Sequence, residues 1–432
     1  MGSDEHYSLN LNVRGLGVSA TIAIKQRCRE LRAAGREVYD FGLGQSPFPV
    51  PAPVVEALRR AAPQKDYLPV RGLPELREAV ADFHRRNDGV AAQAEDVLIG
   101  PGSKELMFLL QIVYYGEILI TSPAWVSYLP QAQIIGRRVG RLHTTYDKDF
   151  KLDLDAFVAS IDAVNDKLRP RLLVLNYPNN PTGASYTADE LEALADVLRR
   201  YEIIVLSDEI YGLLEYDGAH VSIARYYPER TIISSGLSKW CGAGGWRLGT
   251  FVFPHDMRWL LDAMAAVASE TYTSVSAPIQ HASITAFRGG VEIDNYLRQV
   301  RRILATLGHR SAAILRDAGL SVVEPSGAFY VFPDFSPFRE RLEQRGIRDG
   351  ATLCRRMLDE IGVACLPASA FVRSRSELDA RLAFVDFDGA AALAAAEKTP
   401  LDQPLPNGFL EERCGSVLRG MNRLAEWIGQ QS

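Results

Sequence analysis

The chain has 432 residues, a length typical of two or three domains, and its 47% hydrophobic and 23% charged residues are an ordinary globular composition. A net charge of −5 provides no basic field for nucleic acid or an anionic membrane, and no apolar stretch approaches the ~20 residues of a membrane span. The five scattered cysteines form no C-x-x-C pair and no signal peptide is recognised, so the sequence predicts a cytoplasmic protein.

Apolar runs along the first 253 residues predict the framework of the fold. The Pro-rich stretch 47–53 is expected to pack against the C-terminal part of the chain. Residues 103–115 are apolar almost all round, which predicts a buried helix. Near-continuous hydrophobicity in five later runs predicts strands buried on both faces of a mainly parallel sheet. These runs end at Thr121, Asn176, Ser207, Ser235 and Phe253.

Helical patterns lie between and after these strands. Thr187 and Glu190 form a T-x-x-E capping box that begins a helix running to about Arg200. A longer helical pattern extends from about Ile293 and stops at Gly319.

Alternating strands and helices predict an α/β fold with a three-layer large domain, a mainly parallel mixed sheet and a smaller α+β domain. The expected division assigns residues 1–60 to an N-terminal arm and part of the small domain. Residues 61–300 form the large domain, and residues 301–432 form the small C-terminal domain. The second Pro-rich stretch, 399–408, is expected to be a surface loop.

Chemically distinctive side chains follow the predicted strands. Asn176 leads into Y-P-N-N-P-T-G, Asp208 and Tyr211 follow the next strand, and Lys239 and Arg247 come after a third. Because ligands of open α/β sheets bind beyond the carboxyl ends of the strands, these groups are expected to converge. The set suits an anionic aromatic ligand with an aldehyde, which describes pyridoxal 5'-phosphate (PLP).

Each part of PLP has a candidate partner. Lys239 would hold the aldehyde as a Schiff base, and an ionised Asp208 would keep the pyridine nitrogen protonated. Asn180 and Tyr211 could hydrogen-bond the phenolic oxygen. Trp125, just after a strand, offers a flat face for ring stacking.

The phosphate needs an anion site. Residues 100–105, G-P-G-S-K-E, precede the buried helix, so backbone N–H groups and the Ser103 hydroxyl can face an anion, and Arg247 can add a bidentate fork. Taken singly, each signal is more often structural: a lysine at a strand end is usually a solvated charge, and G-P-G-S is often only a turn. Their common order along one chain favours the cofactor.

Three motifs carry a resemblance to a known family: N-N-P-T-G, S-D-E-I-Y and S-K-W-C-G-A-G-G-W-R-L-G, with D-Y-L-P-V-R-G-L-P-E-L-R-E-A-V at 66–80. The chain resembles the class I/II aminotransferases, the aspartate aminotransferase family of fold type I, from about residue 12 to 389. The resemblance implies a PLP-dependent transaminase that moves an amino group from an L-amino acid to a 2-oxo acid by a ping-pong mechanism. Lys239 is then also the group that moves the substrate's proton.

Further roles follow from the resemblance. Gly102, Ser103, Lys104 and Arg247 would surround the phosphate. Tyr67 would reach the phosphate of a neighbouring subunit, which implies a homodimer with shared active sites. Arg381 would bind the α-carboxylate of the substrate beside Gly44.

The sequence departs from the family pattern at several positions. Gly236 stands where many relatives carry a phosphate-binding serine, so Ser235 or Ser238 is a candidate replacement. Gln45–Ser46 and Ala368 differ near the expected substrate pocket. Which amino acid and 2-oxo acid are used therefore stays open.

Three alternative functions can be compared with the motifs. A PLP-dependent lyase, decarboxylase or oxidase of the same fold would share every cofactor contact, so the motifs do not separate it from a transaminase. A transcriptional regulator would need a DNA-binding segment, and only about a dozen residues precede the resemblance. A hydrolase or nucleotide binder is disfavoured, because the sequence has no G-x-S-x-G elbow and no P-loop.

Overall fold

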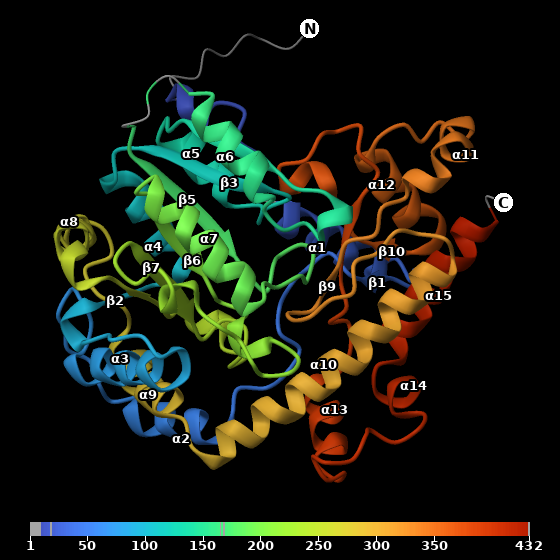
Figure 1. The fold of residues 1–432 in the computed structure, drawn as a ribbon. Helices are drawn as coiled ribbons and strands as arrows, with labels where there is room; N and C mark the ends of the chain where they lie inside the picture. The colour runs from blue at the N-terminus through green and yellow to red at the C-terminus, as the bar shows by residue number, and fades with distance from the viewer. Residues whose placement is uncertain (1–9, 18–19, 165, 167–168, 431–432) are drawn as a thin grey trace, which may run out of the picture.

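The computed structural model describes residues 10–17, 20–164, 166 and 169–430. Its centre is a seven-stranded sheet with the strand order β2-β8-β7-β6-β5-β3-β4 (Figure 1). All neighbouring pairs are parallel except those that β8 forms with β2 and β7. The strands are β2 (Val97–Gly100), β3 (Glu117–Ser122), β4 (Val139–His143), β5 (Arg171–Asn176), β6 (Ile204–Asp208), β7 (Thr231–Gly236) and β8 (Gly249–Val252).

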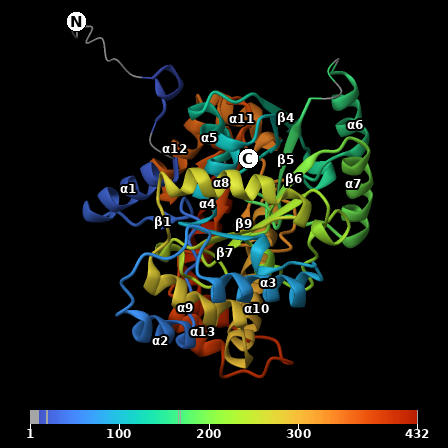
Figure 2. The same ribbon diagram turned by 90° about the vertical axis from the view of Figure 1, so that its left-hand side faces the viewer.

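Helices cover both faces of this sheet (Figures 1 and 2). Successive residues of β5 separate cleanly: Leu172 and Val174 pack in one hydrophobic cluster, and Leu173 and Leu175 pack in another. This alternation follows from the period of two along a strand, and it explains why the strand reads as continuously apolar. The first cluster contains α4 (Ser103–Val113), α5 (Tyr128–Ile134) and α8 (Arg258–Ser269), and the second contains α6 (Leu154–Asp162) and α7 (Ala188–Arg200).

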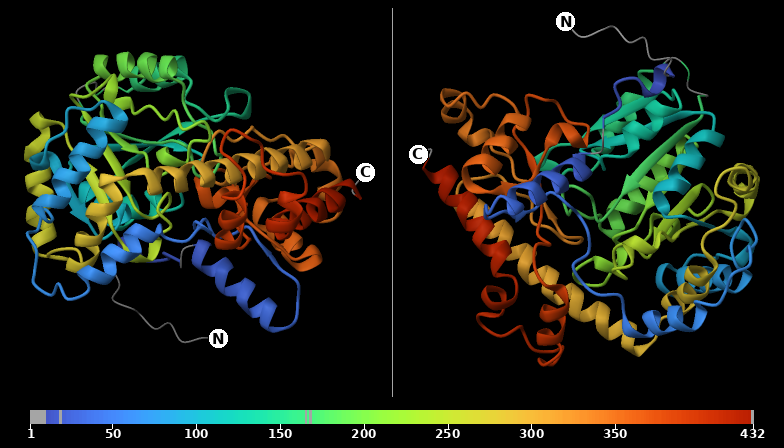
Figure 3. Two further views of the ribbon diagram at one scale, coloured as in Figure 1. Left: turned by 90° about the horizontal axis from the view of Figure 1, so that it is seen from below. Right: turned by 180° about the vertical axis from the view of Figure 1, so that it is seen from behind.

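The second part of the molecule is smaller and is joined to the first by α10 (Val291–Asp317), a helix about 40 Å long. Helix α15 (Gly415–Gly429) lies beside α10 in Figures 1 and 3. Here β11 (Leu366–Pro367), β12 (Ala380–Ala383) and β9 (Tyr330–Val331) form a small antiparallel sheet. The remaining helices of this part are α11 (Arg339–Gln344), α12 (Gly350–Ile361), α13 (Gly389–Ala396) and α14 (Phe409–Arg413).

Segments before residue 100 contribute to both parts. Strand β1 (Tyr39–Asp40) pairs with β10 (Val363–Ala364), and the Phe48 ring meets the Phe387 ring at 5.8 Å, so this stretch packs on the C-terminal part as expected. Helix α2 (Ala52–Ala61) packs instead on α9 (Ala277–Arg288), near α3 (Pro74–Asp88). Helix α1 (Ala20–Ala33) precedes β1 in the chain. The division of the chain at residues 60 and 300 stays a prediction.

The predicted α/β architecture with a mainly parallel mixed sheet is confirmed, as are the five predicted strands and the long helix. Strands β2 and β4 were missed. The run V-L-I-G of β2 is too short for periodicity to identify, and β4 is an edge strand whose residues are mostly exposed or half-exposed. Among the described helices, none has the length and apolar character needed to cross a membrane.

Candidate active site

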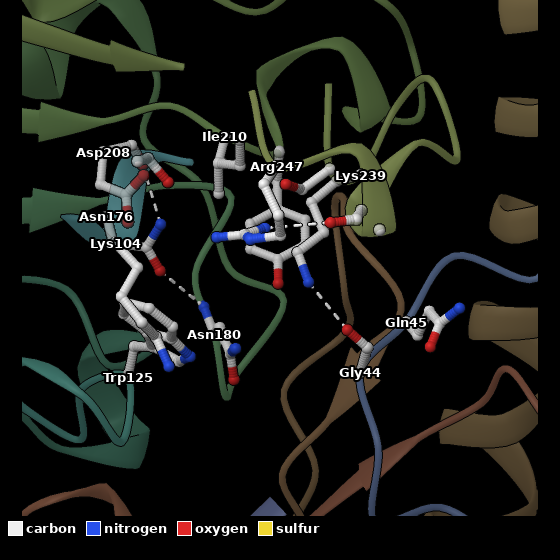
Figure 4. A pocket seen from close by; sticks show the side chains of 15 residues that line it. Gly44, Gln45, Lys104, Trp125, Asn176, Asn180, Asp208, Ile210, Lys239 and Arg247 are labelled. Carbon is white, nitrogen blue, oxygen red and sulfur yellow. Dashed lines mark hydrogen bonds between the residues drawn. The ribbon is translucent and has the colours of Figure 1, made fainter. Parts of the chain in front are cut away.

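A cavity of about 520 Å³ opens at the carboxyl edge of β5, β6 and β7, beside the first residue of β8. Nine of the predicted site residues line it, as Figure 4 shows for most of them. In that view Asp208, Asn176 and Trp125 lie on one side, and Lys239 and Gly44 lie on the other. The nine are Gly44, Ser103, Lys104, Trp125, Asn180, Asp208, Tyr211, Lys239 and Arg247.

Asp208 is the last residue of β6 and is 4% exposed. Its Oδ2 accepts a hydrogen bond from the Tyr128 hydroxyl at 2.5 Å, whereas its buried Oδ1 has no hydrogen-bond partner within the described chain. Burial raises the pKa of this carboxyl to about 6, against the lowering effect of the Tyr128 hydrogen bond. The Asn176 amide holds the Asp208 carbonyl at 2.8 Å. The site therefore presents a carboxylate that a cation in the cavity would stabilise.

Lys239 lies three positions beyond the end of β7. Its Nζ donates to the Gly44 carbonyl at 2.8 Å and lies 5.5 Å from the centre of the Tyr211 ring. Burial, followed by the charge of Arg381, lowers the pKa of the amine to about 8. A larger fraction of the amine is therefore neutral near pH 7 than for an exposed lysine, which suits a nucleophile or a base.

The first turn of α4 and the residues before β8 form an anion cradle. Gly102, the N-cap of α4, has φ +90°, and a Cβ there would lie 2.0 Å from Arg247 Nη2. A Cβ on Gly249 would lie 2.1 Å from the Ser103 nitrogen. Gly249 thus leaves no room for a side chain beside the Ser103 backbone, and the positive φ of Gly102 favours glycine there. Backbone N–H groups and a guanidinium at a helix N-terminus are well suited to a phosphate.

The departure at Gly236 has a packing reason. A Cβ on Gly236 would lie 2.6 Å from the Leu248 carbonyl oxygen, because β7 and β8 meet here as the pair Gly236–Gly249. A serine would push β8 away. Ser238 lines the cavity, so it is the better placed of the two serines that the sequence offered as replacements.

Arg381, on β12, is 1% exposed and is not among the residues that line the cavity. Its Nη1 donates to Asn180 Oδ1 at 3.3 Å, and its Nη2 donates to the Gly42 carbonyl. The guanidinium lies 4.9 Å from the centre of the Tyr330 ring. Arg381 therefore adjoins the site but is covered.

Two further predicted residues lie outside the lining set. Gly102 is the N-cap residue of α4 and directly precedes Ser103 in the anion cradle. Tyr67 is 90% exposed, so within one subunit it does not reach the cavity.

Sequence reasoning missed two tyrosines. The Tyr330 hydroxyl is 2.7 Å from the Tyr211 hydroxyl and accepts from Asn180 Nδ2 at 3.3 Å. A Cβ on Gly44 would lie 2.1 Å from that oxygen, which explains the glycine. Tyr128, the partner of Asp208, stands three residues after Trp125 in S-P-A-W-V-S-Y, and its place in this motif was the available signal. Tyr330 lies in G-A-F-Y-V-F-P, where nothing but tertiary structure distinguishes it from a core aromatic.

Known proteins are similar to this chain in sequence and in fold. The family model of the class I and II aminotransferases matches residues 36–386. An aspartate/prephenate aminotransferase of Thermus thermophilus is 35% identical over 84% of this chain and 91% of its own, and an asparagine–oxo-acid transaminase of Streptococcus mutans is 30% identical over 84% and 92%. Among solved structures, the Thermus thermophilus aspartate aminotransferase with maleate superimposes with a TM-score of 0.82 at 30% identity, covering 97% of this chain and 99% of that one.

These relatives agree with the fold and do not favour a lyase, decarboxylase or oxidase. The chain belongs to the class I and II aminotransferases, and it is a transaminase with the fold type I architecture of the aspartate aminotransferases.

Proposed function

We propose that this aminotransferase uses PLP bound covalently to Lys239, with Asp208 as the partner of the pyridine nitrogen. The observation that carries the proposal is the Asp208 carboxylate: it is buried, faces the cavity opposite Lys239, and has one oxygen without a hydrogen-bond partner in the described part of the chain. A buried carboxylate in that state costs free energy unless a cation pairs with it. A protonated pyridine ring is such a cation.

The rest of the cavity fits the same group. The N-terminus of α4, with Gly102, Ser103 and Lys104, and the Arg247 guanidinium suit the phosphate. The Lys104 ammonium lies 5.0 Å from the centre of the Trp125 ring, and the indole offers a face to an aromatic ring. Asn180 and Tyr211 provide hydrogen-bond donors for the phenolic oxygen. When bound, PLP supplies an electron-withdrawing ring that stabilises negative charge at the substrate Cα.

Different residues of the chain then have different roles in a ping-pong exchange. Lys239, with its pKa lowered to about 8, accepts the Cα proton of the amino acid and returns a proton when the 2-oxo acid is converted. Arg381 and Gly44 bind the α-carboxylate and so direct the Cα–H bond toward Lys239. For this, Arg381 exchanges its hydrogen bond to Asn180 or Gly42 for the carboxylate.

Arg381→Lys is expected to raise KM for the amino acid by about 10- to 100-fold and to lower kcat less, because a lysine cannot form the bidentate pair. The surface change Arg298→Lys, in a residue that bonds Asn295 on the exposed side of α10, is the matched control and should leave KM unaltered. Steady-state rates over a range of amino acid concentrations distinguish the two. An unchanged KM in Arg381→Lys would remove Arg381 from the substrate site.

A direct experiment tests the proposed function. The purified protein is scanned for visible absorption before and after addition of PLP, and amino acids are then screened with a 2-oxo acid present and absent. The relatives are named for aspartate, prephenate and asparagine, so aspartate and asparagine come first. A yellow protein that consumes the amino acid only with an added 2-oxo acid supports the proposal. A protein that PLP cannot turn yellow contradicts the cofactor, and ammonia release without an acceptor contradicts transamination.

We further propose a cytoplasmic homodimer with shared active sites. The exposed Tyr67 supports sharing, because an aromatic side chain this open to solvent within one subunit is available to a neighbour's phosphate site. The five free, buried cysteines suit a reducing compartment. Sedimentation equilibrium of the holoenzyme measures the subunit number, and a monomer at micromolar concentration would contradict the sharing.

A further inference from the structure

A buried carboxylate lies directly behind the proposed site. Glu209 follows Asp208, the last residue of β6, and its side chain meets the Ser207 hydroxyl rather than the Asp208 carboxylate. The side chain is 4% exposed and does not line the cavity that contains Asp208. The proposed function gives it no task.

Glu209 is surrounded by donors. Its Oε1 accepts from the Ser207 hydroxyl and from the Ser222 hydroxyl, each at 2.6 Å, and from the Tyr177 hydroxyl at 3.3 Å. Its Oε2 lies 3.0 Å from His220 Nε2. These contacts hold the ionised form of Glu209, and its pKa is lowered although burial alone would raise it.

His220 is placed between two carboxylates. Its Nδ1 lies 3.1 Å from Glu215 Oε2, while its Nε2 faces Glu209, and the ring is 10% exposed. Both ring nitrogens must donate to satisfy both acceptors, which requires the imidazolium. Burial alone would lower the pKa of His220, but the hydrogen bonds to the two carboxylates raise it to about 10.

Other ionisable groups approach from neighbouring elements. His84 and Asp88 of α3, which are 2.5 Å apart, line a small cavity together with Glu209 and His220. The Tyr177 ring, from the end of β5, lies 5.3 Å from the His220 ring. Among the described groups that contact Glu209 directly, His220 is the one that carries a positive charge.

Glu209 also anchors the backbone of the site through its main-chain hydrogen bonds. The Glu209 N–H donates to the Ser234 carbonyl at 2.9 Å, and the Glu209 carbonyl accepts from Gly212 at 2.8 Å. Side chain and main chain together therefore fix the turn from Asp208 to Tyr211. An uncompensated charge on Glu209 would therefore disturb the position of the adjacent Asp208 carboxylate and of the Tyr211 phenol, two residues after Glu209.

We propose that His220 is a positioning residue for amino transfer: as a cation held between Glu209 and Glu215, it keeps Glu209 ionised and fixes the turn that presents Asp208 and Tyr211 to the cavity. This inference rests on the roles proposed above for Asp208 and Tyr211.

The test is the pH profile of His220→Gln in the holoenzyme. The amide NH2 of glutamine can donate to one of the two carboxylates but carries no charge, so Glu209 is expected to take up a proton at low pH and to become an uncompensated anion as the pH rises. We expect kcat within about threefold of wild type at pH 6 and at least about tenfold lower at pH 8.5, with KM little changed. Wild type lacks this additional decline because His220 stays protonated below a pKa of about 10.

The double variant Glu209→Gln/His220→Gln separates charge compensation from simple loss of packing. With both partners neutral, it is expected to regain most of the kcat at pH 8.5. A surface pair supplies the matched control: His309→Gln removes a 52% exposed ring beside Glu324 and should follow the wild-type profile. A His220→Gln profile parallel to wild type, or a double variant no better than the single one, would overturn the proposal.

Should His220→Gln not fold, Glu215→Gln provides the same test with a smaller change, because it removes one of the two carboxylates that raise the pKa of His220, which should then lose its proton at a lower pH. It is expected to show the same decline toward high pH, about two- to fivefold, and a flat ratio to wild type would overturn the proposal. Wild-type transamination and the visible band of bound PLP are measured first. If these fail, the proposed function is wrong; if they hold and the variant profiles are flat, only the role of His220 is wrong.

Discussion

Replacement of Lys239 by alanine is expected to abolish amino transfer, lowering kcat by about 10⁴-fold or more, because one amine both holds the cofactor and moves the Cα proton. The side chain is placed for this by the turn after β7, and burial lowers its pKa to about 8. The structure thus provides a lysine that can lose its proton near neutral pH. Single-turnover mixing with an amino acid, followed at the visible band of bound PLP, measures the loss.

Two comparisons make the result specific to the amine. Lys239→Arg keeps a positive charge but cannot be deprotonated in a protein, and it is expected to be as inactive as the alanine variant. Lys148→Ala removes a 59% exposed lysine that faces Asp153 and should retain full activity. Turnover by either Lys239 variant at more than about one per cent of the wild-type rate would assign the proton transfer to another group.

The part of the site that was predictable lies at the ends of apolar strands. Asn176 and Asp208 end β5 and β6, whose continuous hydrophobicity identifies them, and parallel pairing then brings the two residues side by side. Arg247 came from the same argument, and antiparallel β8 places its starting end at the same edge. Local periodicity and topology were sufficient here.

The rest depends on contacts between distant segments. Tyr330 and Arg381 come from strands of two to four residues in the small C-terminal sheet, and the chemistry of neither residue shows in its own segment. Arg381 was identified through resemblance alone, and its covered position beside Asn180 could not be foreseen. His220 lies in a loop, and its partner Glu209 reads as an ordinary member of S-D-E-I-Y. Burial by remote helices turns that pair into an internal ion pair.

Asp208→Asn is expected to have opposite effects on activity and on the stability of the cofactor-free protein. Burial raises the pKa of the Asp208 carboxyl from 3.8 to about 6. Above pH 6 the ionised carboxylate therefore lowers the free energy of unfolding of the cofactor-free protein by up to about 3 kcal/mol. Asparagine removes this cost and still accepts from Tyr128. Thermal unfolding without PLP should therefore show a higher Tm for the variant at pH 8, and no difference of that kind at pH 4, where Asp208 is protonated in the folded protein.

The same substitution removes the negative charge that would keep the pyridine nitrogen protonated, so kcat is expected to fall by about 10²- to 10³-fold. The stabilisation by added PLP should also become smaller than in wild type, since the ion pair is lost. Asp189→Asn, in the exposed first turn of α7, is the matched control and should alter neither quantity by much. An Asp208→Asn protein that is fully active would contradict the pairing of Asp208 with the cofactor. A variant that is inactive but no more stable than wild type at pH 8 would mean that the charge of the buried carboxylate is already compensated before PLP binds. A rise in Tm together with a loss of kcat would show that the Asp208 carboxylate destabilises the cofactor-free protein and is nevertheless required for the reaction.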